Sequence, residues 1–518
     1  MRMPRLLLYP LLAAAYPVLA LAAGNPGEIP GLWVLTWPLA ISLFVSLGAW
    51  VLLSVFIRDP DRRAFLTLMV VAVFSWYGYF TIGLGEITWA APYARTVLPL
   101  LFIVAYLAGV TYLVFRLVPN LGGLTRFLTI FTAILVAWTT IKLLRQTAAV
   151  DWSRRRVEPA TTSANASGKV GPDIYLIVLD KYTGSRSLSR NFGFDNADFE
   201  TFLSKRGFVL PRTAQANYIY TELSLAALLN YQYLDDLPPE SRTKAYINHL
   251  VEDNAVWRFL QARHYRFIFF PTRFPVTWSN RFADEQVPDP RRMLSEFEMV
   301  WRRTTLAEPV FSWACHWFNC AAATPLVAYA KLLEWKFDQL SQVPVWPREG
   351  RPLFVFAHIT IPHEPYVFNA DCSVRPPFWP SRQDETPERE AYIAQITCLN
   401  RRLKNIVEHL LHDSPAPPVI LLQSDHGHGR MPPLHIPDVD ATTPDRVAER
   451  TDVFAAYYLP GADGGIVYDS ITPVNVFRTV FRQYFKADLA PLPDKTYWSP
   501  ETQLFKFTRV ERGHASQQ

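Results

Sequence analysis

The sequence predicts a protein of two parts: an N-terminal polytopic α-helical membrane domain of about five spans, and a C-terminal α/β sandwich around a mostly parallel sheet. At 518 residues the chain exceeds one ordinary domain, and most of its apolar excess lies in the first 145 positions. Beyond residue 172, near-continuous apolar runs alternate with helical patterns, which is typical of strands buried on both faces. We therefore expect a membrane domain at 1–145, a linker at 146–171 and one large domain at 172–518.

Five N-terminal segments are apolar enough to cross a bilayer, which takes about 20 apolar residues. The second, "WVLTWPLAISLFVSLGAWVLLSVF", carries no charge, and a buried soluble helix rarely runs that long without a polar face. The first follows Arg2 and Arg5 and contains Ala20-Leu21-Ala22, so it is compatible with a retained helix and with a cleaved signal peptide. Either alternative places the C-terminal part outside. The predicted spans lie near 6–23, 33–56, 65–84, 96–116 and 124–144.

The arginine distribution supports this orientation. The loops on one side of the predicted spans carry seven arginines, whereas the alternate short loops carry only Arg95, so the arginine-rich side is predicted to be cytoplasmic. Arg154, Arg155 and Arg156 lie on the opposite side, but they precede a large domain, where the charge rule is weak. They are compatible with contacts to anionic headgroups and with a solvated linker. The seven arginines are Arg2, Arg5, Arg58, Arg62, Arg63, Arg116 and Arg126.

The cysteine positions and the net charge indicate the redox compartment of the outer domain and the class of partner that is not expected. All four cysteines lie in the predicted outer domain, and an even number there suggests two disulfides, Cys315–Cys320 and Cys372–Cys398. Zinc binding by these cysteines is a weaker alternative, since no CxxC spacing occurs. The net charge of +5 is spread out, with no basic run interleaved with aromatic residues, so nucleic acid is not an expected partner.

The outer domain begins with the strand "DIYLIVLD" at 173–180. Further strands are predicted at 265–271, 352–359, 418–425 and 453–460. Two stretches rich in Pro, Arg and Trp, 272–303 and 372–389, are predicted to be surface excursions.

One helix between these strands has a clear start and a clear buried face. It begins at Thr386-Pro387, a cap followed by proline at the first helical position. Its apolar residues follow at spacings of three and four, namely Tyr392, Ile396, Leu399, Leu403, Ile406 and Leu410.

Three of the predicted strands end in polar residues, and ligands of open α/β sheets bind beyond the carboxyl ends of strands. Asp180 ends the first strand, and "LLQSDHGHG" places Asp425 and His426 at the end of another. Two carboxylates and an imidazole suit Zn²⁺ and also accept Mn²⁺ or Mg²⁺, with a coordination position left open for chemistry. The structural alternative is a polar turn; for Asp180 taken alone, a turn or helix cap is an equal alternative. The stretch 358–363, with a histidine at each end, follows a third strand.

Thr221 is the candidate nucleophile. In "ANYIYTELSLAALLN", 216–230, it precedes an amphipathic helix with Leu225, Leu228 and Leu229. The structural interpretation is a helix N-cap, a role that threonine often fills. The two roles are compatible, because N–H groups and the dipole at a helix N-terminus stabilise an anion there. A bound metal would also have to activate the hydroxyl, since free threonine is a poor nucleophile.

These motifs, in this order, resemble those of a known family. Asp180 after a strand, "NYIYTELSLAALLN", "FAHITIPHEPY" and "LLQSDHGHG" are similar to the sulfatase-like branch of the alkaline phosphatase superfamily. Within it, the chain resembles membrane-anchored bacterial lipoteichoic acid synthases and phosphoethanolamine transferases, over about 172–485. The resemblance implies that Thr221 is phosphorylated during turnover. It also implies that Asp180, Asp425 and His426, together with Thr221, bind a divalent metal.

The resemblance extends to residues that would bind substrate. His363, in "PHEP", matches a histidine that contacts the transferred phosphate, and His435, in "PLHIPD", loosely matches a second substrate histidine at a different spacing. Lys181 would offset phosphate charge, with a solvated lysine as the structural alternative. His358 and His428 have no counterpart, and His358 is equally compatible with a packed residue at a strand end.

Departures from the family narrow the activity. Thr221 is followed by Glu-Leu-Ser, without the Cys-x-Pro-x-Arg type motif of true sulfatases, so sulfate ester hydrolysis is disfavoured. Asp180 is followed by Lys181 rather than a second acid, which fits one ion (Zn, Mn or Mg) better than two.

The function implied is a multi-pass enzyme of the bacterial cytoplasmic membrane with its catalytic domain outside. It would move phosphoglycerol or phosphoethanolamine from a phospholipid donor, through phosphothreonine, to an envelope glycan or lipid acceptor. A phosphodiesterase of the same superfamily is the alternative. A non-catalytic membrane scaffold is disfavoured, because Thr221 and the candidate ligands are all present.

Overall fold

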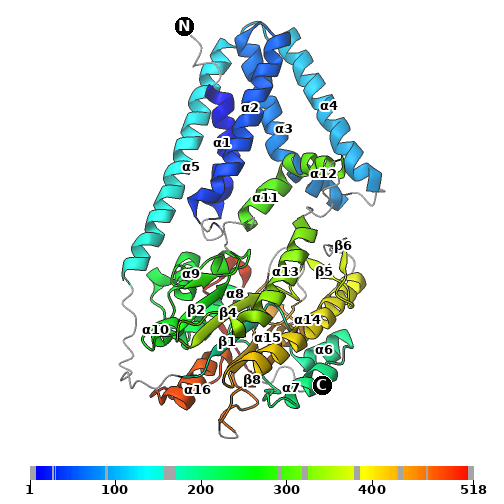
Figure 1. Cartoon of the computed structure of the whole chain (residues 1–518). Helices are drawn as coiled ribbons and strands as arrows, with labels where there is room; N and C mark the ends of the chain where they lie inside the picture. Colours follow the sequence, from blue (N-terminus) through cyan, green and yellow to red (C-terminus); the bar gives the residue numbers. More distant parts are fainter. Residues whose placement is uncertain are drawn as a thin grey trace. The chain divides into compact units, whose positions relative to one another are not determined.

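The structure is a computed structural model, and it divides into two compact units (Figure 1). The helical unit comprises Met1–Ser153, Arg273–Pro275 and Leu294–Ala321, and the α/β unit comprises Arg154–Thr272, Val276–Met293 and Ala322–Gln518. The structure describes residues 8–25, 29, 31–87, 92–156, 171–288, 295–317, 325–378, 385–429, 436–462 and 465–511.

Each predicted span falls on a helix of the helical unit. Among the described residues, two segments are long and apolar enough to cross a membrane, Leu32–Phe56 and Gly122–Ala148. Their large side chains face outward, with Phe44 75 % and Trp138 71 % exposed, which suits a lipid environment better than water. Crossing by the other three helices stays a prediction. The elements are α1 (Leu8–Gly24), η1 (Leu32–Leu35), α2 (Thr36–Phe56), α3 (Pro60–Ile87), α4 (Pro92–Leu117) and α5 (Gly122–Arg156).

Two sequence expectations change in this unit. Helix α5 continues to Arg156, so the predicted linker begins as helix. The predicted excursion at 272–303 is only partly a surface loop, because α11 (Glu296–Thr304) packs Phe297 and Trp301 into an apolar cluster of the helical unit. It is followed by α12 (Ala307–Trp317).

The α/β unit is built on a six-stranded sheet in the order β3-β2-β4-β1-β7-β8. Every neighbouring pair is parallel except β7 and β8, so the predicted mostly parallel sheet is confirmed. All five predicted strands are present, and the edge strand β3 was not predicted because it has only two residues. The strands are β1 (Ile174–Leu179), β2 (Arg266–Phe270), β3 (Glu285–Gln286), β4 (Leu353–Ile359), β7 (Val419–Ser424) and β8 (Ala455–Tyr458).

Helices cover both faces of this sheet. On one face, Val355 and Ala357 of β4 share a core with α13 (Pro325–Gln342) and α14 (Glu385–Asp413). The side chain of Phe354 points the other way, towards Phe477 of α16 (Pro473–Phe485). The apolar face predicted for α14 is fully buried, as the periodicity requires.

The remaining helices and small sheets complete the unit. They are α6 (Ser185–Phe192), α7 (Ala197–Ser204), α8 (Thr221–Asn230), η2 (Pro239–Ser241), α9 (Lys244–Glu252), α10 (Ala255–Gln261), η3 (Pro275–Thr277), η6 (Val343–Val345), η7 (Val439–Ala441), α15 (Pro444–Thr451) and η8 (Glu501–Gln503), with the pairs β5 (Tyr366–Phe368)–β6 (Val374–Phe378) and β9 (Thr496–Trp498)–β10 (Thr508–Val510). The prediction that α8 is amphipathic is wrong, because every residue from Leu223 to Asn230 is buried.

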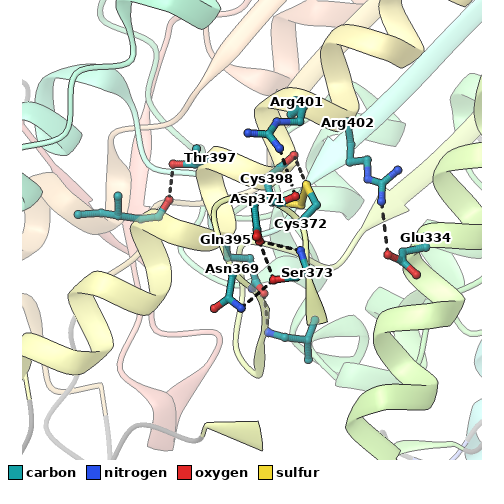
Figure 2. Close-up of a disulfide and its surroundings, with 12 residues drawn as sticks. Glu334, Asn369, Asp371, Cys372, Ser373, Gln395, Thr397, Cys398, Arg401 and Arg402 are labelled. Atoms are coloured by element: carbon teal, nitrogen blue, oxygen red, sulfur yellow. Dashed lines mark hydrogen bonds and ion pairs between the residues drawn. A yellow bond between two sulfur atoms is a disulfide. The ribbon is translucent and has the colours of Figure 1, made fainter. Parts of the chain in front are cut away.

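A disulfide joins the β5–β6 hairpin to α14 (Figure 2). Cys372 and Cys398 are bonded, which confirms the predicted pair. The same hairpin follows the segment that carries His363, whose carbonyl oxygen accepts a hydrogen bond from Gln395 Nε2 of α14 at 3.0 Å. Helix α14 therefore holds the segment after β4 by a covalent bond and by hydrogen bonds. The predicted Cys315–Cys320 pair lies outside the side chains that the structure describes.

Candidate active site at the carboxyl ends of the strands

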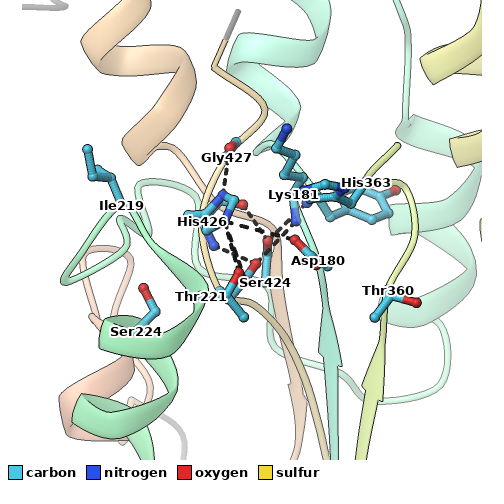
Figure 3. Close-up of polar contacts among 12 residues, drawn as sticks. Asp180, Lys181, Ile219, Thr221, Ser224, Thr360, His363, Ser424, His426 and Gly427 are labelled. Carbon is cyan, nitrogen blue, oxygen red and sulfur yellow. Dashed lines mark hydrogen bonds and ion pairs between the residues drawn. The ribbon is translucent and has the colours of Figure 1, made fainter. Parts of the chain in front are cut away.

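Three adjacent parallel strands bring the candidate residues together. Leu179 at the end of β1 is in register with Ile359 of β4 and with Ser424 of β7, so the three strands end at one level. The next residues along β1 and β7 are Asp180 and Asp425. Figure 3 shows Asp180, Thr221 and His426 directed towards one another, although they come from different parts of the chain.

Asp180, Asp425 and His426 form a buried set of metal-type ligands. Their ligand atoms lie within 4.8 Å of one another, with His426 Nε2 at 3.9 Å from Asp180 Oδ1 and at 3.6 Å from Asp425 Oδ2. These separations exceed hydrogen-bond length and suit neighbouring ligands of one cation held at about 2.0–2.2 Å. Within the described part of the chain, neither oxygen of Asp180 nor Oδ2 of Asp425 accepts a hydrogen bond. A buried carboxylate without donors, beside a second one with an oxygen that accepts none, is unfavourable unless a cation compensates the charge, so this set fits a divalent metal.

His426 presents the correct nitrogen to this set. Its Nδ1 lies 2.9 Å from the carbonyl oxygen of Gly427, and because a carbonyl only accepts, Nδ1 carries the proton. The lone pair of Nε2 is therefore available to a metal. Gly427 is required here, since a Cβ at this position would lie 2.0 Å from the carbonyl oxygen of Glu449.

Thr221 is the first residue of α8, after Tyr220 at the N-cap, rather than the N-cap itself. Its Oγ1 lies 3.3 Å from His426 Nε2. The hydroxyl is therefore at a helix N-terminus, where an anion is stabilised, and beside the candidate ligand set.

Arg450 connects the segment before Thr221 to the loop after β7, and no sequence motif pointed to it. Its guanidinium donates to the carbonyl oxygen of Ile219 at 2.8 and 3.0 Å and to that of His428 at 3.0 Å. Arg450 is buried on α15, so its charge also reaches the ligands. It lowers the pKa of His426, although burial of the imidazole is the larger cause.

The electrostatics of the set favour the loss of charge when no cation is bound. Burial, and then the neighbouring Asp425, raise the pKa of Asp180 well above its usual value. Burial likewise raises the pKa of Asp425 to about 6. A bound cation would reverse both shifts, because it stabilises the ionised carboxylates.

Lys181 is part of the site rather than a solvated lysine. Its side chain is only 12 % exposed, and its Nζ lies 2.9 Å from Glu364 Oε2. Its backbone N–H donates to Asp425 Oδ1 at 3.1 Å, and its φ is 61°, in the left-handed region. Glu364 was missed in the sequence, although it lies beside His363 in "PHEP".

His363 is held by its own backbone. Its N–H donates to the carbonyl oxygen of Asp180 at 3.2 Å, and its Nδ1–H donates to the carbonyl oxygen of Glu364 at 2.6 Å. Burial lowers the pKa of His363 to about 4, so the ring is neutral at pH 7. Its Nε2 is then a proton acceptor.

The other histidines differ in their surroundings. His358 is fully buried, with Nδ1 at 2.9 Å from Thr277 Oγ1 and Nε2 at 3.7 Å from Asp180 Oδ2, so it packs beside a candidate ligand. His428 is paired with α15, with its Nδ1 at 2.9 Å from Glu449 Oε1. His435 lies outside the described residues, and its substrate role stays a prediction.

We compared the chain with known proteins in sequence and in structure, and only the structures gave matches. No protein-family model matches the chain, and no curated protein matches it in sequence. The chain is similar in structure to phosphoethanolamine transferases and to alkaline phosphatase superfamily proteins. The integral membrane protein lipooligosaccharide phosphoethanolamine transferase A from Neisseria meningitidis is 13 % identical, with a TM-score of 0.41 over 92 % of this chain and 95 % of that one.

Two further solved structures are each similar to about two thirds of this chain. The zinc complex of the periplasmic domain of EptC from Escherichia coli is 12 % identical, with a TM-score of 0.40 over 64 % of this chain and 90 % of that one. An alkaline phosphatase superfamily protein from Vibrio parahaemolyticus is 10 % identical, with a TM-score of 0.36 over 68 % of this chain and 80 % of that one.

Proposed function

We propose that this chain is a membrane-bound, metal-dependent phosphotransferase with its catalytic domain outside the cytoplasmic membrane. It moves a phospholipid headgroup, phosphoglycerol or phosphoethanolamine, through a phosphothreonine to a hydroxyl of an envelope glycan or lipid. The observation that carries the proposal is the position of Thr221 Oγ1, at a helix N-terminus and 3.3 Å from His426 Nε2 in a buried ligand set. The motif resemblance supports the same chemistry, and the apolar helices favour a lipid donor.

Asp180, Asp425 and His426, together with Thr221 Oγ1, are the residues that would hold one divalent ion. When bound, the ion would lower the pKa of the threonine hydroxyl and offset negative charge on the phosphoryl oxygens. The carboxylate oxygens that accept no hydrogen bond from the described residues support this assignment.

In the first half-reaction, Thr221 Oγ1 bonds to the phosphorus of the donor as the bond from phosphorus to the diacylglycerol oxygen breaks. The hydroxyl proton of Thr221 passes to water, and the diacylglycerol oxygen takes a proton from water. The N–H groups at the start of α8 stabilise the phosphoryl charge. Lys181 places a second positive charge near the site, held by its ion pair with Glu364.

In the second half-reaction, an acceptor hydroxyl bonds to phosphorus as the bond to Thr221 breaks. His363 Nε2 accepts the proton of the acceptor hydroxyl, because its Nδ1–H is engaged by the Glu364 carbonyl and the ring is neutral. Thr221 Oγ1 takes up a proton as His363 releases the one it accepted, and the enzyme is regenerated.

The test uses the full-length protein in nanodiscs with fluorescent phosphatidylglycerol or phosphatidylethanolamine and Zn²⁺ or Mn²⁺. Wild-type protein and Thr397→Ala, a change on α14, are expected to release diacylglycerol and to carry the headgroup phosphate on Thr221 by intact-mass analysis. Thr221→Ala is expected to do neither. Absence of release and adduct with both lipids, or release that survives in Thr221→Ala, would overturn the proposal. Release of free headgroup phosphate without any acceptor would identify a phosphodiesterase.

A further inference from the structure

The segment 295–317, here called the interface hairpin, returns from the α/β unit to the helical unit. The chain on both sides of it belongs to the α/β unit, yet α11 and α12 cluster with the helical unit. Phe297 and Trp301 share a buried apolar cluster with Val18, Ala22 and Leu143. Helix α11 packs against α1 and α3 (Figure 1). The hairpin is thus a second connection between the two units, besides the chain that follows α5.

The hairpin docks on α3 through a specific backbone contact. The N–H of Leu306, between α11 and α12, donates to the carbonyl oxygen of Phe74 at 2.9 Å. A Cβ added to Gly78 would lie 2.2 Å from the carbonyl oxygen of Arg303 and 2.4 Å from the Cα of Thr304. Only glycine permits this approach, so the hairpin and α3 meet in a close backbone contact that depends on Gly78.

The hairpin is also stabilised internally. Ser295 and Glu298 form a capping box at the start of α11, which fixes where that helix begins. Arg302 of α11 pairs with Glu308 of α12 at 2.5 Å, and its guanidinium lies 4.5 Å from the ring centre of Phe311. The two helices therefore form one unit of defined shape.

Over the described residues, neither helix is long enough to cross a membrane. Helices of 9 and 11 residues are about 14 and 17 Å long, about half of the 30 Å hydrocarbon thickness. The hairpin therefore lies on the same side of the bilayer as the α/β unit. It contacts the C-terminal half of α1, the start of α2, the C-terminal half of α3 and Leu143 of α5. These are the ends that the arginine count places outside, so two independent observations agree on the orientation.

We propose that the interface hairpin binds the phospholipid surface of the outer leaflet. Val300, Val310 and Phe311 are exposed large apolar side chains on it, and Val310 is 60 % exposed. Arg303 ends α11 beside this apolar surface, whereas Arg302 is largely buried in its ion pair with Glu308. Apolar side chains at the acyl boundary with arginines at headgroup level are typical of interfacial helices. The hairpin packs against α2, whose exposed large apolar side chains suit lipid, and this favours a bilayer over a second protein chain.

The test is photocrosslinking with p-benzoylphenylalanine in full-length protein. The probe replaces Val310, and separately Val345, a control in the α/β unit that is 68 % exposed. Nanodiscs contain fluorescent phosphatidylglycerol and phosphatidylethanolamine. Position 310 is expected to form lipid adducts several-fold more than position 345. Equal adduct formation at the two positions, or crosslinks from 310 to a second protein chain, would overturn the proposal. The readout does not depend on catalysis, so failure of the proposed function leaves it interpretable.

Two glycine substitutions test whether the hairpin docks on α3 through Gly78. Gly78→Ala is expected to reduce the lipid adduct at position 310 and to expose the hairpin to protease, because the Cβ separates Leu306 from α3. Gly48→Ala on α2, where nothing lies within 4 Å of an added Cβ, is the control and is expected to change neither. A probe at Phe44 checks that the helical unit still inserts in lipid. Adducts at 310 that are as strong in Gly78→Ala as in the control would refute docking through Gly78.

Discussion

Asp425→Asn is expected to stabilise the metal-free protein while it removes metal binding. Asp425 Oδ1 accepts hydrogen bonds from the N–H groups of Lys181 at 3.1 Å and of His426 at 2.7 Å, and an asparagine oxygen can accept both. Oδ2 accepts none from the described residues. The asparagine amide would replace Oδ2 near Asp180 and turn a repulsion between carboxylates into a hydrogen bond.

The magnitude follows from the pKa of Asp425, which burial raises from 3.8 to about 6. A difference of about 2.2 pH units corresponds to about 3 kcal/mol of unfolding free energy. Because the folded-state pKa is the higher one, the destabilisation is absent below pH 4, grows between pH 4 and 6 and is complete above pH 6. The gain from asparagine is therefore about 3 kcal/mol at pH 7.5 and is largely lost at pH 4.

The assay is denaturant or thermal unfolding of the full-length protein in detergent with EDTA, at pH 7.5 and pH 4, before and after added Zn²⁺. Asp445→Asn is the control, because the Asp445 side chain is 74 % exposed and surface changes shift stability by about 0.5 kcal/mol or less. Zn²⁺ is expected to stabilise the wild type and the control but not Asp425→Asn. A variant that is less stable than wild type in EDTA at pH 7.5, or equally stabilised by Zn²⁺, would refute the reasoning.

Three further outcomes are expected. Cys372 and Cys398 are 26 residues apart, so reduction of their disulfide should lower the unfolding free energy by about 3.5 kcal/mol. It should also reduce turnover, since the hairpin that carries Cys372 follows the His363 segment. Denaturant unfolding measures the first effect and the lipid assay the second, each with and without reductant. Gly427→Ala should cost about 1–3 kcal/mol and weaken metal binding, because its Cβ meets a carbonyl oxygen of α15 at 2.0 Å. Unfolding and metal titration check this, with Gly48→Ala as the control. Below about pH 6 the apparent metal affinity should fall at least about tenfold per pH unit, because the Asp425 carboxyl, and Asp180 with its raised pKa, must lose protons to bind. Calorimetric titration from pH 7.5 to 5 measures this, and a flat profile would contradict it.

Much of the α/β fold follows from local sequence signals. The continuous apolar runs predicted five strands, and all five lie in one sheet because only strands covered on both faces tolerate such runs. The polar residues at the ends of β1 and β7 predicted a shared site, since parallel neighbours end at the same edge. The proximity of Asp180, Asp425 and His426 was therefore predictable from sequence alone.

Other features depend on partners far apart in the chain, so local patterns cannot reveal them. Arg450 joins Ile219 to His428, and Lys181 pairs with Glu364 across 183 positions. The same limit applies to the interface hairpin, whose sequence resembles a surface excursion until the helical unit covers Phe297 and Trp301. Sequence by itself determined which residue types could bind a metal and attack phosphorus, because strand patterns and strand ends are local. Only the tertiary structure decided which charged side chains, such as Arg450 and Lys181, lie near these residues and where the hairpin docks. Those contacts arise from packing between segments that are distant in the chain.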